Sequence, residues 1–143
     1  MTMGSRPRTR DQHGQALVEF SLAFVVLAVL LMAVFDFGRG IYTYNGVSQA
    51  AREIARATGV HPGLVLGQSQ QSLATTATQR GLVPGMQDPV FECVDIAGTA
   101  TGHRPCESGD WVRVTISAPY APVSLLGIGG SFNLSSSSRI RVP

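Results

Sequence analysis

The chain has 143 residues, of which 44% are hydrophobic and only 14% are charged, and its formal net charge is +2 at pH 7. The positive excess lies in residues 1–14, whereas arginines and acidic residues balance over 15–143. A nucleic-acid-binding protein needs a basic face on its folded part, so this distribution excludes nucleic acid as an expected partner.

A nearly unbroken apolar run extends from Ala16 to Phe35 and contains neither Pro nor Gly. About twenty helical residues span about 30 Å, the thickness of the hydrocarbon core of a lipid bilayer. Core helices of soluble proteins are usually shorter or amphipathic, so we expect a transmembrane helix at 16–35, in contact with the lipid bilayer. No small-residue cleavage site follows the run, which argues against a removable secretory signal.

The basic leader, residues 1–14, carries Arg6, Arg8 and Arg10 immediately before the apolar run. Positive flanks of membrane helices stay in the cytoplasm, so the sequence predicts a cytoplasmic N-terminus and an extracytoplasmic C-terminal part. Glu19 is the one ionisable residue inside the run. A carboxylate in hydrocarbon needs a partner or a proton, and we therefore expect Glu19 to have a functional role.

Residues 14–56 resemble the TadE-like family, the pseudopilins and minor pilins of bacterial tight-adherence, Flp-type pilus systems. The matching elements occur in the family's order and are Gly14, Val18-Glu19-Phe20, Asp36-Phe37-Gly38-Arg39 and Ala50-Ala51-Arg52-Glu53-Ile54-Ala55-Arg56. Ile54 departs from the pattern, because the family usually has Gly there. The resemblance says nothing about roughly residues 60–143.

The resemblance implies that a prepilin peptidase cuts between Gly14 and Gln15, which would make Glu19 the fifth residue of the mature chain. It also implies an assembly role for Glu19 and Phe20, in which Glu19 meets the freed N-terminus of a neighbouring subunit. Gln15 of the same chain is one helical turn from Glu19, so an internal pair is also feasible. The alternatives are an uncleaved signal-anchor and a protonated Glu19 that hydrogen-bonds locally.

The helical pattern continues beyond the apolar run as an amphipathic stripe. Its apolar positions are Phe37, Ile41, Tyr44, Val47, Ala51, Ile54, Ala55 and Thr58. We expect this helix to end near Thr58-Gly59, with Pro62 preventing its resumption. Glycines 38, 40 and 46 predict bends near the membrane surface. The pilin-like helix would thus cover residues 15–59, roughly 60 Å.

Arg52 and Arg56 share one face of this helix, and Glu53 lies within ion-pair reach of Arg56. Two interpretations stay open at this point. The three side chains either form a solvated face with one exposed ion pair, or they contact partner subunits.

The remaining residues, 60–143, are expected to form an extracytoplasmic α+β domain. A second helix is predicted over 69–81, with Leu73 and Ala77 facing inward, and a turn over 82–89. Strands are predicted at 90–96, 111–117 and 132–142, with the Pro- and Gly-rich segment 118–131 as a loop. The predicted fold class is therefore α+β, a long N-terminal helix followed by a short helix and a small antiparallel sheet.

Cys93 and Cys106 are the only cysteines, and an even number outside the cytoplasm favours a disulfide. Such a bridge would close a loop of about fourteen residues and stabilise the domain by about 3 kcal/mol. It would join the end of one strand to the approach of the next. The alternative is a pair of buried free thiols.

No arrangement of residues indicates catalysis, so we expect no enzyme and no cofactor. The segment 127–132 lacks the Lys-Ser/Thr of a phosphate loop. His103 lies near Cys106, but the spacing fits no familiar zinc pattern, so we expect no metal site. The sequence thus predicts a pilus component in the bacterial cytoplasmic membrane, with other pilins and the assembly platform as partners. The rival hypothesis is a monomeric, membrane-anchored binding or adhesion module.

Overall fold

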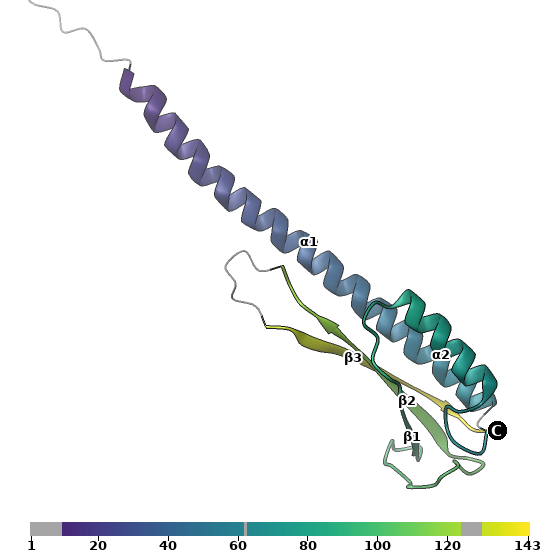
Figure 1. The fold of residues 1–143 in the computed structure, drawn as a ribbon. Helices are drawn as coiled ribbons and strands as arrows, with labels where there is room; N and C mark the ends of the chain where they lie inside the picture. The colour runs from purple at the N-terminus through teal and green to yellow at the C-terminus, as the bar shows by residue number, and fades with distance from the viewer. Residues whose placement is uncertain (1–9, 62, 124–129) are drawn as a thin grey trace, which may run out of the picture. The chain divides into compact units, whose positions relative to one another are not determined.

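The computed structural model describes residues 10–61, 63–123 and 130–143, with side chains from Gly14 onward. The elements are α1 (Arg10–Val60), α2 (Gln70–Leu82), β1 (Val90–Val94), β2 (Trp111–Tyr120) and β3 (Phe132–Arg141) (Figure 1). The predicted α+β fold is confirmed. Parts of three sequence interpretations lie outside the described residues, namely Arg6 and Arg8 of the leader, Pro62, and residues 124–129 of the Pro- and Gly-rich loop.

The chain divides into two units, residues 1–37 and residues 38–143. In the first unit the described residues are helical throughout, and none of the side chains from Gly14 to Phe37 is buried. Leu17 and Phe20 are each 70% exposed, which is the opposite of a soluble core helix. By length and composition, Gly14–Val60 is the one helix among the described residues that qualifies as a candidate membrane span.

Helix α1 has 51 residues and continues without interruption through Gly38, Gly40 and Gly46. These three glycines therefore do not end the helix. Gly46, and Gly59 close to the C-terminal end of the helix, are positions of close packing. A Cβ on Gly46 would lie 3.3 Å from Cγ2 of Val83, and one on Gly59 would overlap Cγ2 of Ile140. The absence of a side chain at these positions lets neighbouring segments approach the helix closely.

The core of the second unit lies between α1 and the inner face of the sheet. Val47, Ala50, Ala51, Ile54 and Ala55 of α1 are at most 1% exposed. They belong to one cluster with Val112, Val114, Ile116 and Ala118 of β2. The small alanines on α1 and the β-branched residues on β2 let helix and sheet come close, because both present short side chains.

The predicted apolar stripe of α1 is only partly correct. Val47, Ala51, Ile54, Ala55 and Thr58 are buried. In contrast, Phe37, Ile41 and Tyr44 are 72%, 46% and 49% exposed. Helical periodicity identifies which face is apolar, but whether that face is buried depends on where a packing partner begins along the helix.

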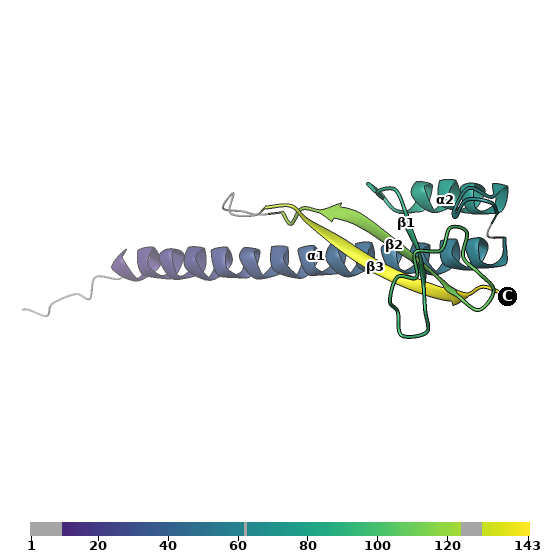
Figure 2. The same cartoon turned by 90° about the horizontal axis from the view of Figure 1, so that it is seen from below.

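The sheet has the order β1-β2-β3, and both pairs are antiparallel (Figures 1 and 2). Val112, Val114 and Ile116 share the buried face of the central strand β2, as predicted from their alternation. The register between β2 and β3 is uninterrupted from Trp111↔Arg141 to Tyr120↔Phe132. The strand ends differ from the prediction, since β1 stops at Val94 and β2 continues to Tyr120.

Helix α2 begins after Ser69, whose hydroxyl accepts a hydrogen bond from the backbone N–H of Ser72 at 3.2 Å. The prediction that Leu73 and Ala77 face inward is wrong, because both are exposed and Leu73 is 48% accessible. Ser72 is buried instead, and its hydroxyl lies 2.6 Å from that of Thr58 on α1. Helix α2 therefore turns Ser72 toward α1, and the neighbouring Leu73 faces outward.

Candidate functional site

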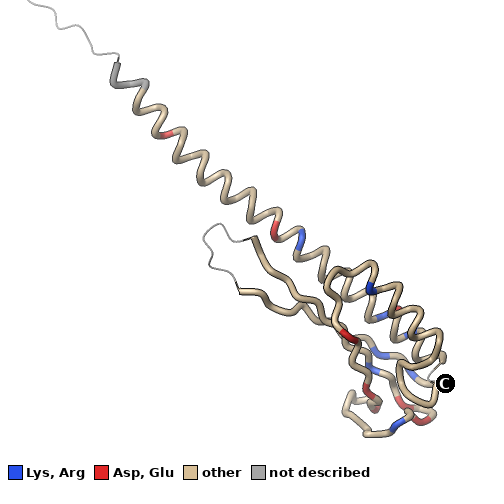
Figure 3. Tube along the Cα trace, in the orientation of Figure 1, with Lys and Arg blue, Asp and Glu red and all other residues tan. Residues whose placement is uncertain are grey.

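The four residues predicted for processing and N-terminal assembly lie on the exposed surface of α1. They are Gly14, Gln15, Glu19 and Phe20. Nothing lies within 4 Å of a Cβ built on Gly14. Glu19 is the only charged residue between Gly14 and Phe35, and it marks the otherwise uncharged stretch of the helix in Figure 3. The helix thus presents one carboxylate among exposed apolar side chains.

Phe20 stacks on Phe24 of the next helical turn, with ring centroids 6.2 Å apart. The hydroxyl of Ser21 donates to the carbonyl oxygen of Val18 at 2.8 Å, which satisfies this polar group within the helix. Apart from Gln15 one turn earlier, the exposed residues around Glu19 are therefore largely apolar. Such a surface suits lipid and the apolar faces of neighbouring helices.

The segment from Ala50 to Arg56 has two faces with different partners. Ala50, Ala51, Ile54 and Ala55 point into the core, whereas Arg52, Glu53 and Arg56 point outward. Nη2 of Arg56 lies 2.9 Å from Oε1 of Glu53, and their side chains are 70% and 44% exposed. The hydrogen bond to Arg56 lowers the pKa of Glu53, and the same bond raises the pKa of Arg56.

Ile54 shows how the chain accommodates its departure from the family pattern. Its side chain is 0% exposed and is among the largest fully buried side chains of the described residues. It packs inside the chain's own core and is not available to a partner. The bulk at this position therefore stabilises the core of the second unit and leaves the outward face of α1 unchanged.

An aromatic cluster joins the far end of the sheet to the first turns of α1 in the second unit. The guanidinium Cζ of Arg39 lies 5.9 Å from the ring centroid of Tyr120. Tyr120 in turn makes an edge-to-face contact with Phe132 at 5.4 Å. A Cβ on Gly40 would lie 3.6 Å from the Tyr120 ring. Sequence reasoning missed this cluster, because its members are far apart in the chain.

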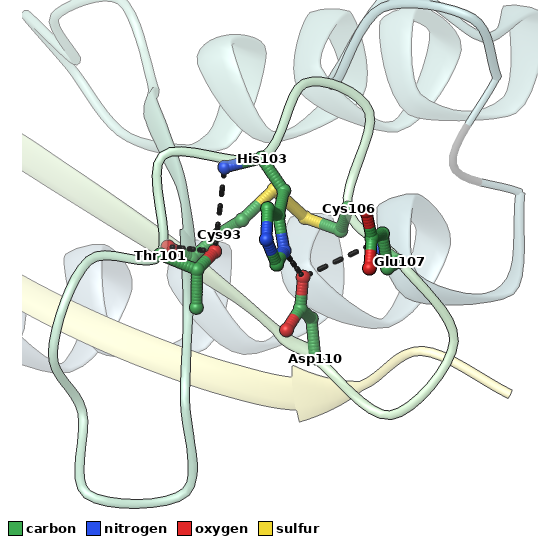
Figure 4. Close-up of a disulfide and its surroundings, with 6 residues drawn as sticks. All are labelled: Cys93, Thr101, His103, Cys106, Glu107 and Asp110. Carbon is green, nitrogen blue, oxygen red and sulfur yellow. Dashed lines mark hydrogen bonds and ion pairs between the residues drawn. A yellow bond between two sulfur atoms is a disulfide. The ribbon is translucent and has the colours of Figure 1, made fainter.

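Cys93 and Cys106 form the expected disulfide, with their Cα atoms 5.4 Å apart (Figure 4). Both residues are buried, so the bridge fixes the loop between β1 and β2 from the core side. With both sulfurs in the bridge, neither is a thiolate ligand for a metal. Among the residues that the structure describes, no group of three or more His, Cys, Asp or Glu side chains could hold a metal ion.

A second constraint on the same loop is the pair His103–Asp110, which sequence reasoning missed. Nδ1 of His103 lies 2.7 Å from Oδ2 of Asp110, and this oxygen also accepts the backbone N–H of Glu107 at 3.0 Å (Figure 4). The hydrogen bond to Asp110 raises the pKa of His103. That bond and the Glu107 N–H lower the pKa of Asp110.

The comparisons with known proteins bear on the helix alone. No curated protein and no solved structure gave a significant match to the chain. One family model did match, and it covers the exposed apolar part of α1 together with most of its packed part. Residues 14–56 match the model described as TadE-like protein, the same residues in which the sequence resembles that family.

Proposed function

We propose that the protein is a membrane-anchored structural or assembly component of a tight-adherence, Flp-type pilus, acting as a TadE-like pseudopilin or minor pilin. The observation that carries the proposal is a coincidence of two features on α1. The family match begins at Gly14, and from there to Phe37 no described side chain is buried within the chain. An apolar helix without internal partners needs an apolar exterior, which lipid and neighbouring pilin helices provide.

In this proposal residues 1–14 form a cytoplasmic leader, 16–35 cross the bacterial cytoplasmic membrane, and the α+β part lies outside. The three leader arginines support this orientation. Prepilin peptidase removes the leader after Gly14, and Glu19 then meets the new α-amino group of Gln15 in a neighbouring subunit. Such a pair would neutralise the carboxylate in the membrane and set the register between helices. The partners are other pilins or pseudopilins and the assembly platform.

Processing tests the proposal most directly. The mass of the chain extracted from membranes should correspond to a start at Gln15. The variant Gly14→Leu should keep the leader, and its fold should be unaffected because the Cβ position at Gly14 is open. Gly81→Leu is the matched control, since its Cβ position is also open and it lies far along the sequence in α2. A native chain that keeps Met1 would favour the monomeric anchored module instead.

The charge of Glu19 gives a second test, which separates anchoring from assembly. Glu19→Gln keeps the size of the side chain and removes the charge. We expect normal insertion and leader removal, with loss of co-purification with other pilus components. Ser21→Ala, on the same exposed stretch, serves as the control and should assemble normally. If Glu19→Gln co-purifies as well as the parent, the carboxylate is not part of the assembly contact.

The outward face of Arg52, Glu53 and Arg56 is a third surface for partner contact. Changing Arg52 and Arg56 together to Gln should leave the ectodomain folded, because both side chains are exposed. We propose that the double variant loses co-purification with pilus components while its unfolding transition is unchanged. Unchanged co-purification would mean that this face is only solvated.

A further inference from the structure

One end of the β2–β3 pair is aromatic and packs against α1 where the second unit begins. Tyr120, the last residue of β2, pairs with Phe132, the first residue of β3, and their rings make an edge-to-face contact. A Cβ on Gly40 would lie 3.6 Å from the Tyr120 ring, so this ring lies against the helix at Gly40. We call Tyr120, Phe132 and Val123, which follows β2, the hairpin end.

The opposite end of the strand pair lies beside the last turns of α1. There Ile140 of β3 packs against Gly59. β2 begins with Trp111 and ends with Tyr120, and a ten-residue strand is about 30 Å long. Trp111 is therefore well separated from the hairpin end, although both belong to the same strand.

Apolar and aromatic side chains are exposed around the hairpin end. Phe132 and Val123 are 52% and 55% exposed. On α1, next to Gly40 in the sequence, Ile41 and Tyr42 are exposed as well, Tyr42 by 72%. A group of exposed apolar side chains of this size marks a surface that contacts another molecule or a membrane.

The hairpin end also lacks charged residues. No charged residue occurs between Arg113 and Arg139, nor on α1 between Arg39 and Arg52. In Figure 3 the strand ends beside the grey trace carry neither blue nor red. The guanidinium Cζ of Arg39, at the border, lies 5.9 Å from the centroid of the Tyr120 ring. Tyrosines with a flanking arginine are typical of the layer where a membrane protein meets the lipid headgroups.

The position of Gly40 in α1 indicates what covers this surface. The proposed membrane span ends at Phe35, five residues earlier, and α1 is helical without interruption across both positions. Five helical residues advance about 7.5 Å at most, whatever the tilt of the helix. The headgroup layer on each side of a bilayer is about 5–7 Å thick. Gly40, and with it the ring packed on it, therefore lies within or directly beside the headgroups.

We propose that the hairpin end is a second membrane contact, in which Tyr120, Phe132 and Val123 lie in the lipid headgroup layer. A tyrosine suits this layer because its ring is apolar and its hydroxyl is polar. The contact attaches the second unit to lipid through residues that are about eighty positions from the span in the sequence. The inference rests on the proposed membrane anchoring, and the experiment below tests the two separately.

Tryptophan fluorescence in brominated bilayers tests this contact. Trp111 is the only tryptophan, so Trp111→Phe removes the background and Phe132→Trp places a reporter at the hairpin end. The full chain is reconstituted in bilayers whose lipids carry bromine on the acyl carbons next to the headgroup. Bromine quenches indole only at short range. We therefore expect the reporter to lose at least about half of its emission relative to unbrominated bilayers.

Three further reporters control this measurement. Leu27→Trp, in the middle of the proposed span, should be quenched by lipids brominated deep in their acyl chains. Trp111 of the parent chain should keep its emission, because it lies about 30 Å along β2 from the hairpin end. Val123→Trp, at a second exposed position, should be quenched like Phe132→Trp and guards against a folding defect of one variant.

The reporters also separate the possible failures. Quenching of Leu27→Trp without quenching of Phe132→Trp and Val123→Trp would overturn this proposal and leave the anchoring intact. Emission from Leu27→Trp that bromine does not change would overturn the anchoring, and the proposed function with it. Quenching of Trp111 as strong as that of the hairpin reporters would also overturn the proposal, because the contact would then not be confined to this end.

An added charge tests whether the apolar surface makes the contact. Phe132→Glu, introduced into the Val123→Trp reporter, should reduce quenching, because a carboxylate is costly to place among lipids. Ser137→Glu adds the same charge at an exposed position farther along β3 and should leave quenching unchanged. Equal effects of the two substitutions would overturn the proposal.

Discussion

Two stretches of the same helix are used in opposite ways. From Gly14 to Phe37, α1 is apolar and exposed, and no described side chain there is buried. From Val47 to Gly59, the helix buries alanines, a valine and an isoleucine against the sheet. The family match includes residues from both stretches. The comparison shows that the helical structure and the family match extend over both stretches, although the chain itself covers the apolar face in only one of them.

Removing apolar volume from each stretch in turn should give the largest difference in the free energy of unfolding. Ile54→Ala should lower the free energy of unfolding of the second unit by about 2–5 kcal/mol, because it creates a cavity in a packed core. Leu27→Ala, where the side chain is 53% exposed, should change it by less than about 0.5 kcal/mol. Urea unfolding in detergent, followed by the fluorescence of Trp111, measures both. Similar losses of unfolding free energy in the two variants would contradict the difference in packing between the two stretches.

The disulfide stabilises only the second unit, which contains the packed stretch of α1. Replacing Cys93 and Cys106 together by Ala should lower the free energy of unfolding of the second unit by about 3 kcal/mol, because the bridge restricts the unfolded chain. Insertion into the membrane should be unaffected, since the bridge lies in the second unit. The unfolding transition with and without reductant provides the measurement. Reductant should not shift the unfolding transition of the double variant. A shift there would mean that reductant acts through something other than this disulfide.

Glycine replacements test whether the close approaches around α1 are real constraints. Gly59→Ala should destabilise by about 1–3 kcal/mol, because the added Cβ would overlap Ile140 and force a local shift. Gly81→Ala meets nothing within 4 Å and should instead stabilise by about 0.5–1 kcal/mol, from higher helix propensity. Thermal unfolding of the two variants side by side checks the signs. Two changes of the same sign would contradict the packing role of Gly59.

The pair His103–Asp110 should have the smallest effect on stability, and this effect should appear as a dependence of stability on pH. The raised pKa of His103 means that its contribution is complete below the ordinary histidine pKa of about 6.5 and is lost as the pH rises through the raised value. The lowered pKa of Asp110 means that its contribution is lost as the pH falls through the lowered value. Stability should therefore be highest between the two. His103→Gln should flatten the decline at higher pH, measured by unfolding across that range.

Much of the architecture follows from local sequence patterns. The apolar run, the alternation of Val112, Val114 and Ile116, and the even number of cysteines each point to one structure, because composition and short-range periodicity determine local conformation. The same patterns predicted a helix at 69–81, which the structure shows at Gln70–Leu82, but they placed Leu73 on the wrong face. There a buried hydroxyl contact between Thr58 and Ser72 outweighs the apolar side chain, and no local pattern records such a contact.

Only the tertiary structure decided which residues distant in the sequence come into contact. The amino-acid sequence by itself determined a membrane-length helix, a TadE-like segment at 14–56, three strands and a disulfide. It could not show that Ile140 packs against Gly59, that Arg39 contacts the ring of Tyr120, or that the loop after β1 folds back to pair with it. These features depend on how the strands and helices pack, and packing is set by the whole chain together and not by any one segment.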